Sequence, residues 1–183
     1  MTRIPAVDPA SATGKAGDLL QAVKKKLGVV PNLFRVAAHA PAALEGLLGL
    51  SGSLAGGTLS PRTREAVALA VAETNACDYC LSAHTYLGRA AGLSGTDVEA
   101  ARRGEATDPR LAATLAFAGR LVETRGRVTA ADVVAARAAG LDDAALVEVV
   151  GHVALNIFTN YLNHVADTEI DFPVVRTGTA AAA

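Results

Sequence analysis

Apolar residues recur every three to four positions along most of the chain, which is the spacing of a helix that buries one face. Start and stop signals divide this pattern. Ser60-Pro61, for example, combines a capping hydroxyl with proline at the first helical position. The pattern predicts helices over residues 18–27, 31–39, 41–54, 61–75, 77–91, 94–103, 108–125, 129–140 and 142–167. No segment alternates as a half-buried strand does, so we predict an all-α fold.

The 183 residues are predicted to form one domain over residues 18–172. Residues 1–17 are rich in proline, alanine, glycine and serine, and we expect them to form a flexible arm. Residues 173–183 show no pattern and are expected to form a flexible tail.

The composition of the chain excludes some classes of function. Lysine and arginine number 17 against 18 aspartates and glutamates, so the chain lacks the basic footprint of a nucleic-acid binder. No apolar run in the sequence approaches the ~20 residues of a membrane span, and no signal-peptide pattern opens the chain. We therefore expect a cytoplasmic protein with neither nucleic acid nor membrane as partner. Aromatic residues make up only 4% of the chain, which also favours helices.

The two cysteines of the chain, Cys77 and Cys80, lie at i and i+3, and His84 follows at i+7. These positions share one face of a helix, and the imidazole can reach the Cys80 sulfur. A thiolate is a nucleophile, and a nearby imidazole can take its proton or stabilise its charge. Glu65, on the preceding predicted helix, is the best candidate to orient the histidine. The pattern favours redox chemistry.

Other interpretations of the cysteines are weaker. Cys77, Cys80 and His84 supply three ligands, whereas a structural zinc site takes four. Haem attachment needs a histidine directly after the second cysteine, and Leu81 stands there. A thioredoxin site needs a preceding strand, and that segment is predicted to be helical. A buried structural pair of cysteines is the plain alternative.

An internal similarity accompanies the cysteines. Glu65 precedes them by twelve and fifteen residues, and Glu148 precedes Asn160 and Asn163 by the same distances. The match suggests two related helical hairpin halves, the second of which has lost its thiols.

The remaining polar residues on apolar helices are expected to be structural. His39, His152 and His164 have no ligand spacing to the cysteines. His39 is expected to be a residue at a helix end. His152 and His164 could line the site from the last predicted helix, but we expect them to be satisfied structural histidines. Asn156, Asn160 and Asn163 form a stripe that predicts a buried hydrogen-bonding seam. Four arginines are expected to be surface charges: Arg62, Arg64, Arg102 and Arg103.

Glu65, followed after eleven residues by Cys77-Asp78-Tyr79-Cys80 and by His84, resembles the motif of the AhpD-like alkylhydroperoxidases in the carboxymuconolactone decarboxylase superfamily. Residues 30–34 and 156–173 resemble a subgroup of uncharacterised peroxidase-related proteins. The resemblance implies an all-α bundle that assembles into trimers, dimers or hexamers. It also implies reduction of organic hydroperoxides without metal or other cofactor, at the expense of a dithiol or thiol-protein donor.

By this resemblance Cys80 attacks the peroxide and Cys77 resolves the resulting sulfenic acid into a disulfide. His84 and Glu65 form the proton relay, through a water. The decarboxylase branch lacks the cysteine pair, so lactone decarboxylation is not expected.

The sequence departs from the family at Tyr79, where some members carry a second histidine. A neutral phenol does not shuttle protons near pH 7 as imidazole does. This departure favours a second hypothesis, in which the pair serves a redox-sensing or disulfide-exchange protein without efficient turnover.

Overall fold

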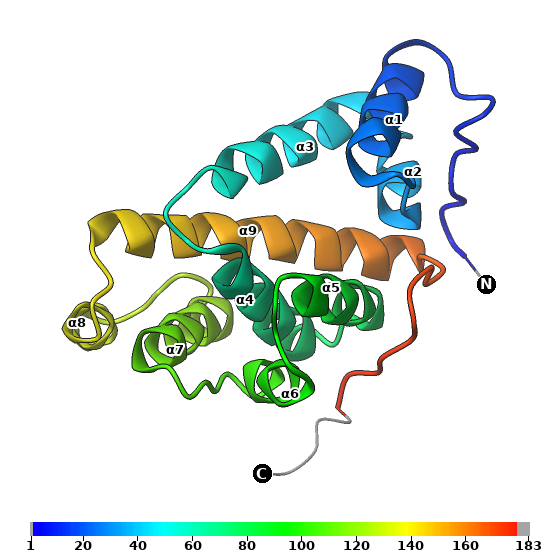
Figure 1. Cartoon of the computed structure of the whole chain (residues 1–183). Coiled ribbons are helices and arrows are strands. Elements are labelled where there is room, and N and C mark those ends of the chain that lie inside the picture. The colour runs from blue at the N-terminus through cyan, green and yellow to red at the C-terminus, as the bar shows by residue number, and fades with distance from the viewer. Residues whose placement is uncertain (1, 179–183) are drawn as a thin grey trace.

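The computed structural model describes residues 2–178, which fold entirely into helices and connecting segments (Figure 1). Within this range the helices are α1 (Gly14–Leu27), α2 (Asn32–Ala37), α3 (Pro41–Ala55), α4 (Pro61–Thr74), α5 (Asp78–Ala90), α6 (Gly95–Arg102), α7 (Pro109–Thr124), α8 (Ala130–Ala138) and α9 (Asp143–Ala166). The all-α prediction is confirmed. Every predicted helix is present, and its ends agree within about two residues, apart from the beginning of α1 at Gly14.

The predicted start signals act as caps. The Ser60 hydroxyl accepts a hydrogen bond from the Thr63 amide at 3.1 Å, with Pro61 as the first helical residue of α4. Ser94 with Asp97, and Thr129 with Asp132, form reciprocal capping boxes at α6 and α8. Local side chains therefore fix where these helices begin.

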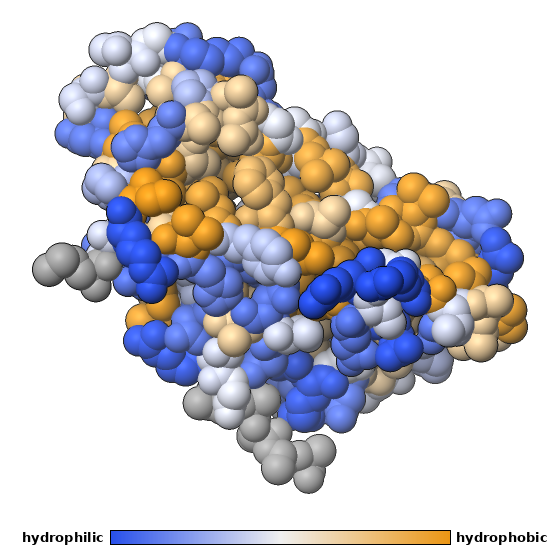
Figure 2. Space-filling model, turned by 180° about the vertical axis from the view of Figure 1, so that it is seen from behind, coloured by the Kyte–Doolittle hydropathy of each residue, from blue (hydrophilic) through white to orange (hydrophobic). Residues whose placement is uncertain are grey.

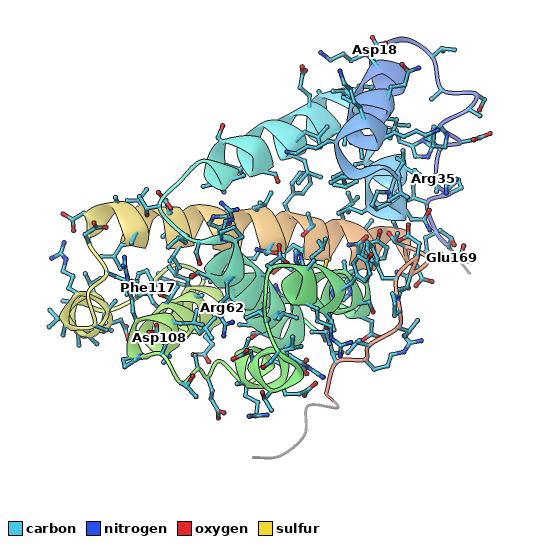
Figure 3. The ribbon with its side chains drawn as sticks, viewed as in Figure 1. Asp18, Arg35, Arg62, Asp108, Phe117 and Glu169 are labelled. Carbon is cyan, nitrogen blue, oxygen red and sulfur yellow. The ribbon has the colours of Figure 1, made fainter. Side chains whose placement is uncertain are left out.

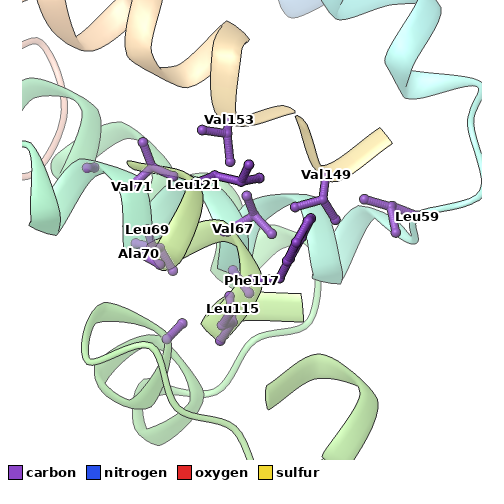
Figure 4. Packing of buried hydrophobic residues seen from close by; sticks show 14 of the residues in the cluster. Leu59, Val67, Leu69, Ala70, Val71, Leu115, Phe117, Leu121, Val149 and Val153 are labelled. Atoms are coloured by element: carbon purple, nitrogen blue, oxygen red, sulfur yellow. The ribbon is translucent and has the colours of Figure 1, made fainter. Parts of the chain in front are cut away.

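Helix α4 lies at the centre of the core and packs against α5, α6, α7 and α9. All seven residues from Ala66 to Ala72 are buried, and four of them are alanines, which let neighbouring helices approach closely. Figure 4 shows Val67 and Val71 of α4 among side chains of α7 and α9. The core residues from those two helices include Leu115, Phe117, Leu121, Val149 and Val153.

The first three helices form a second layer over α9 (Figure 1). They have a small core of their own around Leu20, Ala37 and Leu44. This layer meets the rest of the molecule along α9 and leaves a pocket between the two layers, described below.

Both ends of the described chain contact the helices. The amides of Arg3 and Ile4 donate to the Ala166 carbonyl at 2.8 and 3.2 Å. Residues 168–178, here called the C-terminal strap, run along α5, where the Val175 amide donates to the Ser82 hydroxyl at 2.9 Å. The Asn32 side chain of α2 donates to the Glu169 carbonyl of this strap at 3.0 Å, and Figure 3 shows Glu169 near the end of α9.

The predicted terminal segments fit this picture in part. Residues 14–17, expected in the arm, are helical. The flexibility of the two ends stays a prediction, and residues 179–183 of the expected tail lie outside the described residues.

The predicted second hairpin is wrong. Glu148, Asn160 and Asn163 all lie on α9, a single uninterrupted helix of 24 residues. The first half bends between α4 and α5 because Ala76 adopts a left-handed conformation with φ of 52°. Within α9 no residue leaves the helical conformation, so the equal spacing of the two sets does not reflect equal structure.

Arg102 is also not a surface charge. Its side chain is 3% exposed, and its guanidinium contacts Glu73 Oε2 at 2.9 Å and Glu99 Oε1 at 3.0 Å. It donates as well to the Arg176 carbonyl at 2.9 Å. This one side chain joins α4, α6 and the C-terminal strap.

Helix α9 is the one described helix that is long and apolar enough to cross a membrane by length and composition. Its buried face carries His152, Asn156, Asn160 and Asn163. Polar side chains on the buried face are in keeping with a core helix of this bundle.

We expect Arg102→Ala to lower the free energy of unfolding by about 3–5 kcal/mol, because it leaves the Glu73 and Glu99 carboxylates without their buried partner. Urea denaturation measures this loss. The control is Arg120→Ala, which removes an exposed pair with Glu123 and is expected to cost less than about 1 kcal/mol. Equal losses in the two variants would contradict the role given to Arg102.

Candidate functional site

The two cysteines lie at the beginning of α5. Cys77 is the N-cap residue, Cys80 lies in the first turn, and both are free thiols, each 2% exposed. The turn that precedes them is fixed to α9, because the Asn75 side chain donates to Asn160 Oδ1 at 2.8 Å. The predicted placement of the pair near a helix start is confirmed.

Side chains and backbone of α9 face the two sulfurs. Asn163 Nδ2 donates to Cys80 Sγ at 3.2 Å, and Thr159 Oγ1 lies 3.9 Å from the same sulfur. The Cys77 thiol lies 3.9 Å from the Asn160 carbonyl. The asparagine stripe is thus buried as predicted, and part of its hydrogen bonding goes to the thiols.

Neighbouring groups give the two thiols different pKa values. The pKa of Cys80 is lowered to about 6 by hydrogen bonding from Cys77, by the positive charge of His84 and by the Asn163 and Asn160 amides, against the effect of burial. The pKa of Cys77 is raised, because its thiol is held by Cys80 and is buried. The pair therefore keeps a proton on Cys77 and negative charge on Cys80.

His84 and Glu65 meet as predicted from their spacing. His84 Nδ1 lies 2.8 Å from Glu65 Oε2, which joins α5 to α4. Burial alone would lower the pKa of His84, but the charges of Glu65 and Cys80 outweigh it and raise that pKa. Glu65 thereby orients the ring and stabilises an imidazolium beside the Cys80 thiolate.

Tyr79 has a structural role. Its hydroxyl donates to Asp171 Oδ1 at 2.8 Å and accepts from the Leu33 amide at 3.0 Å. Its ring also packs edge-on against Phe172, with the centroids 5.9 Å apart. Burial raises the pKa of this phenol. The residue between the cysteines thus ties the first turn of α5 to α2 and to the C-terminal strap.

Cys80 opens onto a pocket of about 490 Å³ between the layer formed by α1, α2 and α3 and the helices α4, α5 and α9. In Figure 2 apolar residues gather in a band between the N-terminal helices at the upper left and the polar lower part of the molecule. The walls are mostly apolar and include Leu33, Phe34, Leu47, Ala68, Leu155 and Phe172. The polar groups that line it are Ser51, Arg64, Glu65, Cys80, His84, His152, Asn156 and Thr159. Cys77 is not among the lining residues and lies behind Cys80.

Comparisons with known proteins agree with this arrangement. Residues 40–123 match the carboxymuconolactone decarboxylase family. The matched segment runs from α3 to α7 and includes Glu65, both cysteines and His84. Among the curated proteins, no sequence matches it.

Solved structures share the all-α, AhpD-like fold of this chain. The alkylhydroperoxidase AhpD core of an uncharacterised peroxidase-related protein from Ralstonia eutropha JMP134 superposes with a TM-score of 0.83 at 23% identity, over 93% of this chain and 92% of the other. A peroxidase-related protein from Silicibacter sp. TM1040 gives 0.77 at 22% identity, over 91% of each chain. A cysteine-to-alanine variant of the debrominase Bmp8, in complex with 2,3,4-tribromopyrrole, gives 0.77 at 18% identity, over 93% and 92%.

Two residues of the AhpD-like pocket differ from expectation. His152 is 5% exposed, lines the pocket, and its Nε2 has no hydrogen-bond partner, so it is not a satisfied structural histidine. Arg64 lines the pocket as well and is not merely a surface charge. One signal could have found His152: it extends the asparagine stripe of α9 by one turn.

The other two histidines are structural, as predicted. His39 Nε2 lies 2.8 Å from the Pro5 carbonyl, and His164 Nε2 lies 2.8 Å from the Asn75 carbonyl. Among residues 2–178 no group of three or more histidine, cysteine, aspartate or glutamate side chains is arranged to hold a metal ion.

We expect the Cys80 thiol to ionise near pH 6, while Cys77 stays protonated throughout the neutral range. Ultraviolet absorbance of the thiolate during a pH titration of the reduced protein measures both. Asn163→Leu removes an N–H donor to the sulfur and shifts the Cys80 titration toward higher pH. The matched control is Asn156→Leu, an equally buried asparagine of α9 that bonds to the His152 carbonyl instead. The same titration in both variants would contradict the role of Asn163.

Proposed function

We propose that this protein is a thiol-dependent peroxidase that reduces organic hydroperoxides. The observation that carries the proposal is the asymmetry of the cysteine pair. Cys80 lines the pocket, accepts a hydrogen bond from Asn163 and has a lowered pKa, whereas Cys77 lies behind it and keeps its proton. A thiolate that faces a pocket, with a thiol behind it, suits attack followed by resolution.

In the first step the Cys80 thiolate attacks the outer oxygen of the hydroperoxide. The sulfur–oxygen bond forms, the oxygen–oxygen bond breaks, and the alkoxide takes a proton from the His84 imidazolium to leave as an alcohol. Cys80 is oxidised to a sulfenic acid. Glu65 keeps the imidazole oriented through the 2.8 Å contact with Nδ1.

In the second step Cys77 gives its proton to His84 and attacks the Cys80 sulfur. The disulfide forms, and the hydroxide that leaves takes that proton and becomes water. A dithiol or thiol-protein donor then reduces the disulfide by two electrons and returns one proton to Cys77 and one to His84. No metal or other cofactor enters this cycle.

The pocket supports an organic substrate. Its walls are formed largely by leucine, alanine, phenylalanine and tyrosine side chains, which favour an apolar body over free hydrogen peroxide. We also propose that the protein works in the cytoplasm, where thiol pools keep such a pair reduced between turnovers.

The second hypothesis, redox sensing or disulfide exchange, is favoured by the bonds around Tyr79. This residue lies between the cysteines, and its hydroxyl bonds to Asp171 of the C-terminal strap and to the Leu33 amide of α2. A disulfide between Cys77 and Cys80, which flank Tyr79, would therefore act through these bonds on the segments that cover the pocket. In this case oxidation changes structure and is not followed by turnover.

We expect the reduced protein to lose both thiols on addition of cumene hydroperoxide and to consume the peroxide continuously when excess dithiol is present. Cys80→Ser abolishes both, because it removes the nucleophile. Cys77→Ser stops after one equivalent, with Cys80 as a sulfenic acid that can be trapped. His84→Gln lowers the rate by about 10²- to 10⁴-fold, as expected for loss of a general acid.

His39→Gln is the control, since this histidine bonds to the Pro5 carbonyl away from the pocket and should leave the rate unchanged. Thiols that survive the peroxide would overturn the peroxidase proposal. A single round of oxidation without further consumption in the wild-type protein would support the redox sensor instead.

We propose in addition that copies of the chain assemble through α9. Five apolar side chains on one face of this helix remain exposed, between 39% and 71%: Val147, Val150, Phe158, Tyr161 and Val165. Their spacing forms a stripe along the whole helix, opposite the face that packs on the core. A continuous apolar stripe of this kind is typical of a surface that a second copy covers.

We expect the wild-type protein to elute as a homo-oligomer in size-exclusion chromatography with light scattering, and Val147→Glu combined with Tyr161→Glu to convert it to a monomer. Two charges in the stripe oppose its burial. The control is Val134→Glu on α8, a valine that is 64% exposed outside the stripe. A monomeric wild-type protein, or the same mass in all variants, would contradict this proposal.

A further inference from the structure

We propose that Arg64 and His152 form an anion subsite in the pocket, and that the substrate is an apolar monocarboxylic acid that also carries the hydroperoxide. This inference rests on the proposed function, because the subsite would hold the far end of the molecule that Cys80 reduces. It assigns a substrate class that the apolar walls alone do not specify.

Arg64 is a cation beside an apolar pocket without a carboxylate partner. Its Nη1 donates to the Ala55 carbonyl at 2.6 Å, and within residues 2–178 no aspartate or glutamate oxygen pairs with its guanidinium. Arg62, on the same helix, pairs with Asp97 at 2.9 Å, and Arg102 is held by two glutamates. The remaining donors of Arg64 are therefore suited to an incoming anion.

His152 adds a second donor from α9. It is 5% exposed, and its Nε2 has no partner. Burial and then the charge of Arg64 lower the pKa of this imidazole, so at neutral pH the ring is uncharged and its Nε2 is free to carry the single N–H. A buried polar nitrogen left without a partner is costly, and a ligand oxygen that reaches it removes that cost.

The carboxylates of Glu148 and Glu65, near the proposed subsite, bind other groups. Glu148 and Glu65 both act on His152 through their charges. The Glu148 carboxylate accepts from the amides of Thr58 and Leu59 at 2.8 and 3.0 Å, and Glu65 is bound to His84 at 2.8 Å. Neither one neutralises Arg64 at ion-pair distance.

The spacing of residues along α9 gives the length of the proposed substrate. His152 precedes Thr159 by seven residues, which is about 10 Å along the helix axis. Thr159 Oγ1 lies 3.9 Å from Cys80 Sγ, so the reacting sulfur is at one end of this span and His152 at the other. Between them Leu155 contributes an apolar wall. A benzene ring or a medium-length alkyl chain between carboxylate and hydroperoxide fits this distance.

The test compares cumene hydroperoxide with its para-carboxylate, which share the same reacting group. We expect the wild-type protein to prefer the carboxylate in kcat/KM by about tenfold or more, the effect of one charged hydrogen bond. Arg64→Gln raises KM for the carboxylate until the preference over cumene hydroperoxide disappears. Arg64→Lys keeps part of the preference because the charge remains, and His152→Leu reduces it.

Arg89→Gln is the matched control, an exposed arginine of α5 outside the pocket that should keep the full preference. Equal kcat/KM values for the two peroxides in the wild-type protein would overturn the subsite. So would an Arg64→Gln variant that slows both peroxides alike.

A binding measurement separates this inference from the proposed function. Calorimetry with 4-isopropylbenzoate and its neutral amide uses no peroxide and no turnover. Tighter binding of the acid that disappears in Arg64→Gln supports the subsite even if the protein consumes no peroxide. Equal binding of acid and amide, or no binding of the acid, overturns it even if the protein is an active peroxidase.

Discussion

The chemistry of this protein depends on the contact between the polar face of α9 and the first turn of α5. Two thiols at a helix N-terminus gain some stabilisation of a thiolate from the unpaired amides of that turn. What distinguishes them here comes from outside their own helix: Asn163 donates to Cys80, while the Asn160 carbonyl faces the Cys77 thiol. The donor lies beside one sulfur and the acceptor beside the other. The negative charge is therefore placed on Cys80, the cysteine that lines the pocket.

This contact holds because α4 fixes both partners. Its run of buried residues from Ala66 to Ala72 packs against α9 on one side and α5 on another. The turn at Ala76 then returns the chain so that α5 begins beside α9, and Asn75 fastens that turn to Asn160. The small alanine side chains of α4 keep the helices close enough for asparagine, a short residue, to reach a sulfur. Longer side chains at these positions would separate α5 from α9.

The sequence was sufficient for those features that local residues determine. Caps such as Ser60 and Ser94 lie next to the helices they begin, and the placement of Cys80 and His84 one turn apart follows from helical geometry. Features that depend on which helix faces which were harder. His152 extends the polar stripe of α9, but only the packing of α9 distinguishes it from His164: His152 lines the pocket, whereas His164 bonds to the Asn75 carbonyl. Tyr79 appeared as a departure from a family pattern, and its bonds to Asp171 and Leu33 are long-range contacts that no local pattern encodes.

The equal spacing around Glu65 and Glu148 is the clearest example of a local pattern that misleads. Both segments run along apolar helices, yet one breaks at Ala76 and the other continues as α9. The continuous helix presents different residues at different positions along its buried face, and an apolar stripe on the opposite face. Asn160 and Asn163 face the thiols, His152 and Leu155 line the pocket, and Tyr161 and Val165 face outward. A bent hairpin at this place could not hold these three sets at fixed distances along one axis. Reactivity of the thiols and length of the pocket are therefore set at successive positions along the buried face of one rigid helix, and the exposed apolar stripe is set by the opposite face.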